Sequence, residues 1–115
     1  MPSSSSKTET IETLNGDSCT KIKAIGEIGT EWRLIILDDL QDGEKRFNEL
    51  KRSTGASSRT LSRVLDDLQE LDLVSRRVED QPIATYYRVT EKGEALCPVF
   101  EAMEQWAEEW VDSVL

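Results

Sequence analysis

The 115-residue sequence contains no histidine, only two cysteines and three prolines, and no long apolar run. The absence of histidine removes the commonest general base and the commonest metal ligand. No segment reaches the roughly 18 consecutive apolar residues that a membrane-spanning helix needs. The N-terminal stretch is rich in serine and threonine and has no apolar signal segment. We therefore expect a cytoplasmic protein without a membrane span.

The residues that are scarce also argue against an enzyme. The two cysteines, Cys19 and Cys97, lie far apart and do not form a metal-binding spacing. A structural disulfide between them is not expected in a reducing cytosol. The sequence offers neither a nucleophile–base pair nor a glycine-rich phosphate loop. We expect no catalytic residues, no bound metal and no cofactor.

Charge is what the sequence has in excess, and it is unevenly distributed. The chain carries 14 basic and 23 acidic residues, for a formal net charge of −9. The net charge is −5 over residues 1–44 and −6 over residues 89–115, but +2 over residues 45–88. A protein that contacts phosphates is expected to concentrate its cations in one region. The acidic remainder is typical of a halophilic protein kept soluble in a high-salt cytoplasm.

Apolar residues at helical spacing predict three helices in the first half of the sequence. Each of them is followed by a glycine, a residue strongly enriched just past a helix C-terminus. Thr30 is suited to the N-cap of the second helix, and a very short strand is expected before the third. The expected ranges are residues 19–28, 31–42 and 48–54, with the strand at 45–47.

The second half predicts a longer helix, two strands and a final helix. Ser57 is a good N-cap for a helix over residues 58–71. Residues 73–79 and 85–90 alternate as strands do, and Pro82 favours a loop between them. The final helix is expected over residues 91–115. The apolar stripe of the longer helix comprises Leu61, Val64, Leu65, Leu68 and Leu71.

This order predicts a mostly α-helical α+β protein, a winged helix-turn-helix whose wing is a small β-hairpin. In that fold the second helix of the pair enters the DNA major groove. Its apolar stripe faces inward, so Arg59 and Arg63 face outward with neighbouring hydroxyls. Arginine binds guanine or phosphate bidentately, and hydroxyls bond phosphate oxygens or base edges. The alternative is that Ser57 is a plain cap and the two arginines are a solvated pair.

Cations outside this helix are candidates for phosphate contacts from the helix before it and from the wing. Side chains alternate along a strand, so at most one of Arg76 and Arg77 is expected to point at DNA from that strand. The residues predicted to contact double-stranded DNA are Ser57, Ser58, Arg59, Thr60, Ser62, Arg63, Lys51, Arg52, Arg76, Arg77 and Arg88.

The final helix carries more apolar residues than a small domain can cover alone. Such a stripe at the end of a domain commonly pairs with its copy in a second chain. We therefore expect the first and last helices to form a homodimer interface, with a small-molecule pocket between them as the alternative. The predicted interface residues are Ile22, Ile25, Leu96, Phe100, Met103, Trp106 and Trp110.

Several segments resemble the HxlR family of winged-helix transcriptional regulators. These are "EWRLIILDDLQDGEKRFNELKR", "SSRTLSRVLDDLQELDLVSRRV", "YYRVTEKGEAL" and "FEAMEQWAEEW", which together cover about residues 19–110. Within them, Gly-x-x-Arg-Phe-x-Glu-Leu and Tyr-x-Val-Thr-x-x-Gly are the more distinctive motifs. The resemblance implies a homodimer that binds a roughly palindromic operator and regulates a nearby gene.

The resemblance also implies a role for Cys19. Cysteines near this position in the family can sense electrophiles or oxidants, so a redox or small-molecule effector is implied. A reactive thiol needs nearby cations or a helix N-terminus, and Lys21 and Lys23 are close in sequence. The sequence departs from the family because Thr20, not proline, follows Cys19. The family wing is usually more basic than the acidic "VEDQPIAT" found here.

We expect residues 1–17 to be a disordered lead-in and residues 18–115 to form the DNA-binding domain, with the dimerisation helix at 91–115. The predicted function is a sequence-specific DNA-binding transcriptional regulator. Two alternatives remain: a winged-helix module that binds protein partners without DNA, and a regulator that responds to thiol modification at Cys19.

Overall fold

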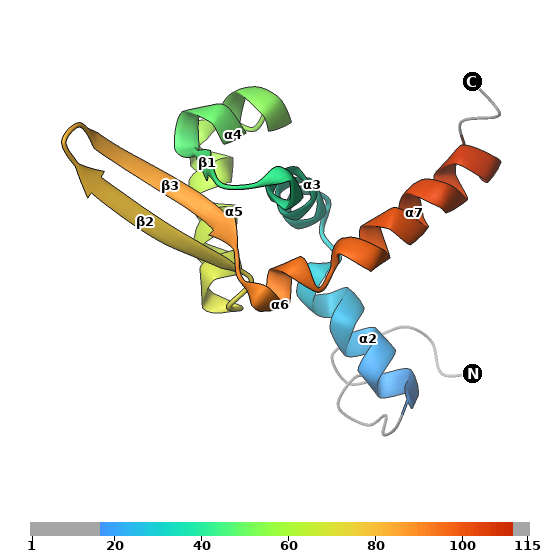
Figure 1. Cartoon of the computed structure of the whole chain (residues 1–115). Helices are drawn as coiled ribbons and strands as arrows, with labels where there is room; N and C mark the ends of the chain where they lie inside the picture. The colour runs from blue at the N-terminus through green and yellow to red at the C-terminus, as the bar shows by residue number, and fades with distance from the viewer. Residues whose placement is uncertain (1–16, 112–115) are drawn as a thin grey trace. The chain divides into compact units, whose positions relative to one another are not determined.

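The computed structural model describes residues 17–111 (Figure 1). The expected lead-in lies outside the described residues except for Asp17, where helix α2 (Asp17–Ile28) begins. The chain divides into two compact units, one ending at Leu34 and the other beginning at Ile35. The expectation of a short first helix that ends before Gly29 is confirmed.

Helix α3 (Glu31–Asp39) begins where the sequence predicts. The Thr30 hydroxyl accepts a hydrogen bond from the Arg33 backbone N–H at 3.3 Å, as an N-cap does. The last predicted turn is a separate 3-10 turn, η1 (Leu40–Asp42). Gly43 follows with a φ of 133°, a conformation that favours glycine.

A short strand and the first helix of the helix-turn-helix come next. Strand β1 (Lys45–Arg46) runs directly into α4 (Phe47–Thr54). Gly55 ends α4 in the left-handed conformation, with its N–H bonded to the Lys51 carbonyl. The turn that follows buries Ala56 and leads into the second helix.

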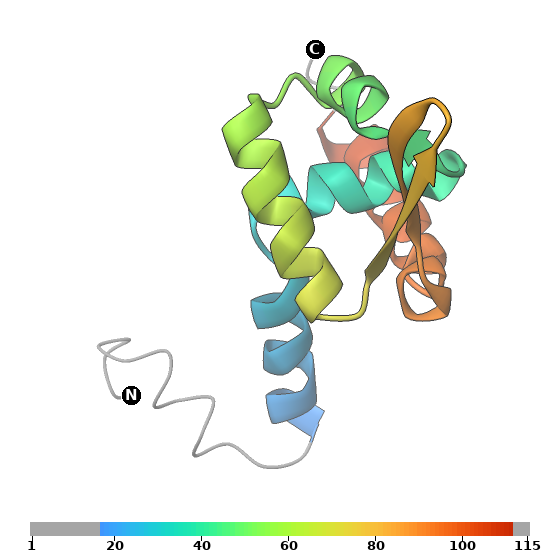
Figure 2. The same ribbon diagram turned by 90° about the vertical axis from the view of Figure 1, so that its left-hand side faces the viewer.

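Helix α5 (Ser58–Glu70) begins at the predicted residue and ends one residue before the predicted end, because Leu71 is its half-buried C-cap. The Ser57 hydroxyl accepts a hydrogen bond from the Thr60 N–H at 3.1 Å and caps the first turn. The apolar stripe faces the core, with Leu61, Val64, Leu65 and Leu68 buried. Figure 2 shows α5 beside the hairpin, with α4 near the N-terminal end of α5.

The sheet has three antiparallel strands in the order β1-β3-β2, so the predicted hairpin gains a third strand. Strand β2 spans Val74–Asp80 and β3 spans Ile83–Val89. The expected five-residue loop is therefore wrong, because Asp80 pairs with Ile83 and only Gln81 and Pro82 lie between them. Proline has no N–H to donate, and at the turn between the two strands no ladder hydrogen bond requires one.

The structure divides the segment expected as one helix from residue 91 into two helices. Helix α6 (Glu91–Glu94) is capped by Thr90, and α7 (Cys97–Trp110) follows after a short turn. Pro98 lies in the first turn of α7, where its missing N–H is tolerated, and it could not continue α6. The end of the predicted helix, residues 112–115, lies outside the described residues.

The core of the second unit is formed by leucines and isoleucine from the helices together with apolar side chains of the sheet. This arrangement confirms the mostly helical α+β winged-helix fold. No buried charged or polar residue was found among the described residues. The fully buried large side chains are Ile36, Leu37, Leu40, Leu50, Leu61, Leu65, Leu68 and Leu73.

Candidate nucleic-acid interface

The first two turns of α5 present polar side chains to solvent. Arg59 and Arg63 are exposed, as are the hydroxyls of Ser58 and Ser62, while the opposite face of the helix is buried. Thr60 is half-buried, and its backbone N–H bonds to the cap. Short hydroxyls beside two arginines permit close approach to a phosphate backbone or to base edges.

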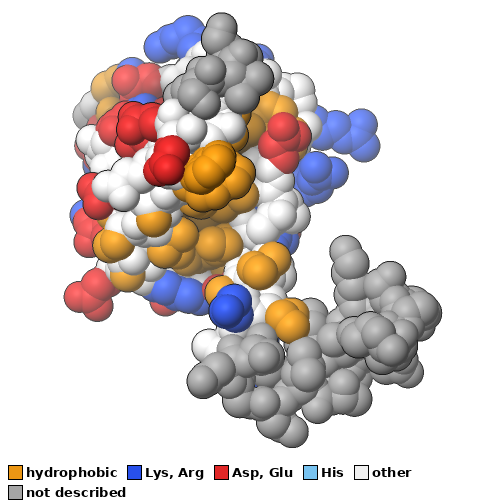
Figure 3. All heavy atoms as spheres, turned by 90° about the vertical axis from the view of Figure 1, so that its right-hand side faces the viewer, with side chains coloured by type: hydrophobic (Ala, Val, Ile, Leu, Met, Phe, Trp, Pro, Cys, Tyr) orange, Lys and Arg blue, Asp and Glu red, His pale blue; other side chains and the backbone are white. Residues whose placement is uncertain are grey.

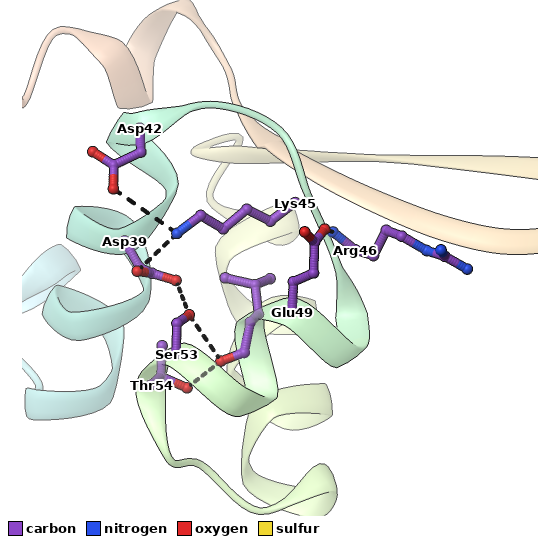
Figure 4. Close-up of polar contacts among 8 residues, drawn as sticks. Asp39, Asp42, Lys45, Arg46, Glu49, Ser53 and Thr54 are labelled. Atoms are coloured by element: carbon purple, nitrogen blue, oxygen red, sulfur yellow. Dashed lines mark hydrogen bonds and ion pairs between the residues drawn. The ribbon is translucent and has the colours of Figure 1, made fainter.

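Helix α4 adds Lys51 and Arg52, both exposed in its last turn. An ionic network holds this helix in place, as Figure 4 shows. Asp39 at the end of α3 accepts a hydrogen bond from Ser53 of α4 at 2.5 Å. The other carboxylate oxygen of Asp39 pairs with the Lys45 Nζ at 2.9 Å. Lys45 is thus engaged within the protein, whereas Lys51 and Arg52 point outward from a fixed helix.

The arginines of the wing lie on two different faces of the hairpin. Facing residues of an antiparallel pair share one side of the sheet. Arg76 pairs with Tyr87, whose buried ring lies 6.4 Å from the Phe47 ring of α4, so Arg76 is on the side that faces the helices. Arg77 pairs with Tyr86 and Arg88 with Ser75, which places both arginines on the opposite side. The sequence prediction that the two consecutive arginines point opposite ways is confirmed.

Burial raises the pKa of the Tyr87 phenol, and the guanidinium of Arg76 partly opposes that shift. Arg76 is itself exposed, so its charge remains open to solvent on the helix side of the wing. A phenol with its ordinary pKa of about 10 is already neutral at physiological pH, and the raised pKa moves its ionisation further from that range. A neutral phenol adds no negative charge beside Arg76.

Arg77 is held by acidic side chains. Its Nη2 lies 2.8 Å from Glu44 Oε1, its Nε donates to Glu44 Oε2 at 3.2 Å, and its Nη1 lies 2.6 Å from Glu79 Oε2. The guanidinium also stacks 4.3 Å from the centre of the Tyr86 ring. These hydrogen bonds raise the pKa of Arg77 and lower the pKa of Glu44.

Helix α7 exposes a stripe of apolar side chains. Val99, Met103, Trp106 and Trp110 follow one another at intervals of three or four residues, and both tryptophans are 62% exposed. Figure 3 views the side of the molecule that carries α7 and shows apolar side chains gathered there. Of the other predicted interface residues, Ile25 is exposed, and Ile22, Leu96 and Phe100 are half-buried.

The two cysteines differ in what the structure describes. Cys97 is half-buried, and its Sγ lies 3.8 Å from the Glu101 carboxylate. Burial and that carboxylate raise the pKa of the Cys97 thiol. For Cys19 the structure describes the backbone alone, which lies in the first turn of α2. Among residues 17–111, no cluster of acidic or cysteine side chains suited to a metal is present.

The sequence matches the model of the HxlR-like helix-turn-helix family over residues 27–114. The chain belongs to the HxlR-like family. Relatives of this HxlR-like chain are named as HTH-type transcriptional regulators, and transcriptional regulation is its function. No helix within the described part of the HxlR-like chain is long and apolar enough to cross a membrane.

Individual relatives align over most of the HxlR-like chain. An uncharacterized HTH-type transcriptional regulator of Methanothermobacter thermautotrophicus is 34% identical, over 76% of this chain and 69% of that protein. YodB of Bacillus subtilis is 34% identical over 82% and 87% of the two chains. The structure of reduced YodB has a TM-score of 0.72 at 30% identity, covering 87% of this chain and 98% of that one. The redox regulator HypR in its reduced form has a TM-score of 0.75 at 32% identity, covering 83% and 96%.

Two sets of polar contacts near the site were not predicted from the sequence. Glu44 is the partner of Arg77, but the two are 33 residues apart and nothing local to either links them. The Asp39–Lys45–Ser53 network likewise joins residues from three elements. The glycine before Glu44 marks a turn, and only the sheet register shows which strand that turn approaches.

Proposed function

We propose that this HxlR-like regulator binds operator DNA with α5 in the major groove. The observation that carries the proposal is the exposed polar start of α5, backed by a fully buried apolar face and fixed by an N-cap. Arg59, Arg63, Ser58 and Ser62 would read bases and nearby phosphates. Such a regulator acts in the compartment that holds the genome, which for this chain we take to be the cytoplasm.

The flanking cations would position the protein on the duplex. Lys51 and Arg52 end α4, and Arg76 lies on the helix side of the wing, so all three suit phosphate contacts. Arg77 and Arg88 lie on the other side of the hairpin, where the Glu44 carboxylate interacts with both charges. The basic segment thus divides into a group that faces DNA and a group that faces an acidic residue.

We further propose that the regulator acts as a homodimer on a palindromic operator. The apolar stripe of α7 is the supporting observation, because solvated tryptophans on one helix face favour association. Two copies of α5 would then enter major grooves about 34 Å apart, or a multiple of that distance. An effector would act by changing the relative orientation of the two recognition helices.

A footprint on the DNA upstream of the protein's own gene tests the proposal. It should be made at low and at molar salt, since the acidic surface suits a halophilic protein, and should include the Arg59→Ala/Arg63→Ala variant. We expect a palindromic protected region that the variant loses. Protection that the variant retains would contradict base reading by α5. No protection at any site, including after genome-wide capture of bound DNA, would favour a module that binds protein partners.

Single substitutions separate base reading from phosphate contact. Arg59→Ala should cost about 1–3 kcal/mol on the operator and relax specificity, whereas Lys51→Ala should weaken all sequences equally and lower the salt dependence. Titration of the operator and of a scrambled duplex over a salt series measures both effects. If Arg59→Ala lost the same affinity on both duplexes, Arg59 would contact phosphate and would not read bases.

A second candidate function is a response to oxidants or electrophiles through Cys19. YodB structures are described as reduced, diamide-treated and quinone-bound, and HypR is described as a redox regulator. The backbone of Cys19 lies in the first turn of α2, and a helix N-terminus stabilises a thiolate. Diamide or a quinone should change operator affinity in the wild type and leave Cys19→Ser unaffected. The same response in Cys19→Ser would contradict this role.

A further inference from the structure

The outer face of the wing carries a compact ionic cluster, here called the wing bridge: Glu44, Arg77, Glu79 and the ring of Tyr86. Arg77 makes two ion pairs, and its fork engages both carboxylate oxygens of Glu44. Glu44 belongs to the turn between η1 and β1, whereas Arg77 and Glu79 lie on β2. The wing bridge therefore ties the hairpin to the turn that precedes the helix-turn-helix.

The wing bridge spans the sheet at the place where β1 is attached to it by few backbone hydrogen bonds. Strand β1 contributes only Lys45 and Arg46 to the sheet, paired with Tyr87 and Tyr86 of β3. Strand β2 is the far edge strand, and β3 lies between it and β1. The Arg77–Glu44 pair thus crosses over β3 and joins edge strand β2 to the turn that precedes β1. Beneath it, Tyr86 stacks with Arg77 at 4.3 Å and with Arg46 at 5.8 Å.

Several facts argue against Arg77 as a phosphate contact. Its guanidinium is neutralised by two carboxylates, and a phosphate would have to displace bidentate hydrogen bonds. It lies on the side of the hairpin opposite Arg76, which shares its side with the buried Tyr87. A planar fork that binds one carboxylate twice and stacks on an aromatic ring also fixes orientation, which a single contact would not.

We propose that Arg77 is a positioning residue: the Glu44–Arg77 bridge sets the orientation of the wing, so that Arg76 can reach phosphate while α5 occupies the groove. This inference rests on the proposed DNA contact of α5 and the wing. It assigns Glu44, an acidic residue beside a DNA-binding surface, a role that supports DNA binding.

The change in DNA affinity caused by Glu44→Gln has opposite signs for a positioning role and for a phosphate contact of Arg77. If Arg77 bound phosphate, Glu44→Gln would release it and remove a negative charge, and DNA binding would tighten. If the bridge positions the wing, Glu44→Gln weakens binding by about three- to fivefold, in line with the small value of an exposed ion pair. Asp80→Asn is the matched control, because it removes the same charge from the same wing but leaves the bridge intact. It should leave affinity unchanged or raise it slightly.

Titrations on the operator and on a random duplex of about 30 base pairs, which spans two grooves one turn apart, provide the test. Arg77→Gln should weaken binding to the same extent as Glu44→Gln, and the double variant should be no weaker than either alone. The slope of log affinity against log salt should stay unchanged. Tighter binding by Glu44→Gln, or a slope reduced by about 0.9 in Arg77→Gln, would overturn the proposal in favour of a phosphate contact.

A distance measurement without DNA keeps the inference separate from the proposed function. Nitroxide labels at Gln81→Cys on the wing tip and Glu70→Cys at the end of α5, in a variant whose native cysteines are serine, report the wing orientation. We expect Glu44→Gln and Arg77→Gln to broaden the distance distribution and Asp80→Asn to preserve it. An unchanged distribution in Glu44→Gln would overturn the inference. If the wild type bound neither duplex at any salt, the proposed function would fail, and this measurement would still decide whether the bridge holds the wing.

Discussion

Cys97 illustrates how burial and neighbouring carboxylates set the reactivity of a thiol. The Cys97 pKa is raised by burial and by the Glu101 carboxylate, so less of the reactive thiolate is present at neutral pH. We expect Glu101→Gln to lower that pKa and to speed alkylation of Cys97 by iodoacetamide. The measurement is the alkylation rate against pH in a Cys19→Ser background, where the half-maximal rate should move to lower pH.

Glu104→Gln provides the control for this prediction, because it removes a carboxylate from the same helix but has no contact with the thiol. It should leave the alkylation profile of Cys97 unchanged. Equal shifts in the two variants would indicate a general charge effect along α7. No shift in Glu101→Gln would mean that burial and the Asp38 carboxylate, and not Glu101, raise the pKa of the thiol.

At the same residue scale, the sequence predicted the α5 surface well and the wing arginines less well. Exposure of Arg59 and Arg63 follows from the period of the buried stripe, which one helix contains within itself. The surroundings of Arg77 depend on Glu44, and they are brought together only by strand pairing. Periodicity reports which face a side chain is on, but it does not report what lies opposite that face.

At the scale of elements, helix α6 packs closely against its neighbours at Gly93. A Cβ added at Gly93 would lie 2.4 Å from the Leu73 carbonyl oxygen and 2.9 Å from the Val89 Cβ. We therefore expect Gly93→Ala to destabilise the protein by about 1–3 kcal/mol, although alanine favours helices. The free energy of unfolding from urea titration measures the loss.

Gly26→Ala, inside α2, is the matched substitution. A Cβ there meets nothing within 4 Å, so the helix propensity of alanine should stabilise the chain by about 0.5–1 kcal/mol. Changes of opposite sign in the free energy of unfolding would confirm that close approach to Leu73, just before β2, and to Val89 of β3 explains the glycine of the Tyr-x-Val-Thr-x-x-Gly motif. A stabilising Gly93→Ala would refute that explanation.

The helices were predictable at the element scale, whereas the sheet was only partly so. Ser57, Thr30 and Gly55 mark helix ends through chemistry that acts within one turn. The two-residue turn of the hairpin and the pairing of β1 with β3 depend on register. The break between α6 and α7 was readable from Pro98, yet the apolar spacing continues across it and favoured one helix.

For the whole molecule, the distribution of charge and apolar surface indicates two different partners. Cations concentrate in the segment that forms α4, α5 and the wing, while α7 is acidic apart from its apolar stripe. An acidic helix with two solvated tryptophans suits a second protein chain better than DNA. The proposed twin copy would also give a small domain enough DNA contact to be specific.

The proposed homodimer is tested by placing a charge in the stripe of α7. Trp106 is 62% exposed, and burying Glu at this position in a dimer would cost its hydration. We expect Trp106→Glu to weaken dimerisation by about 2 kcal/mol or more, as loss of a central aromatic anchor does. Sedimentation equilibrium over a concentration series measures the change, with Gln105→Glu as the control because it adds the same charge beside the stripe. A wild-type chain that is monomeric throughout, or a Trp106→Glu dimer as tight as the control, would contradict a dimer interface on α7.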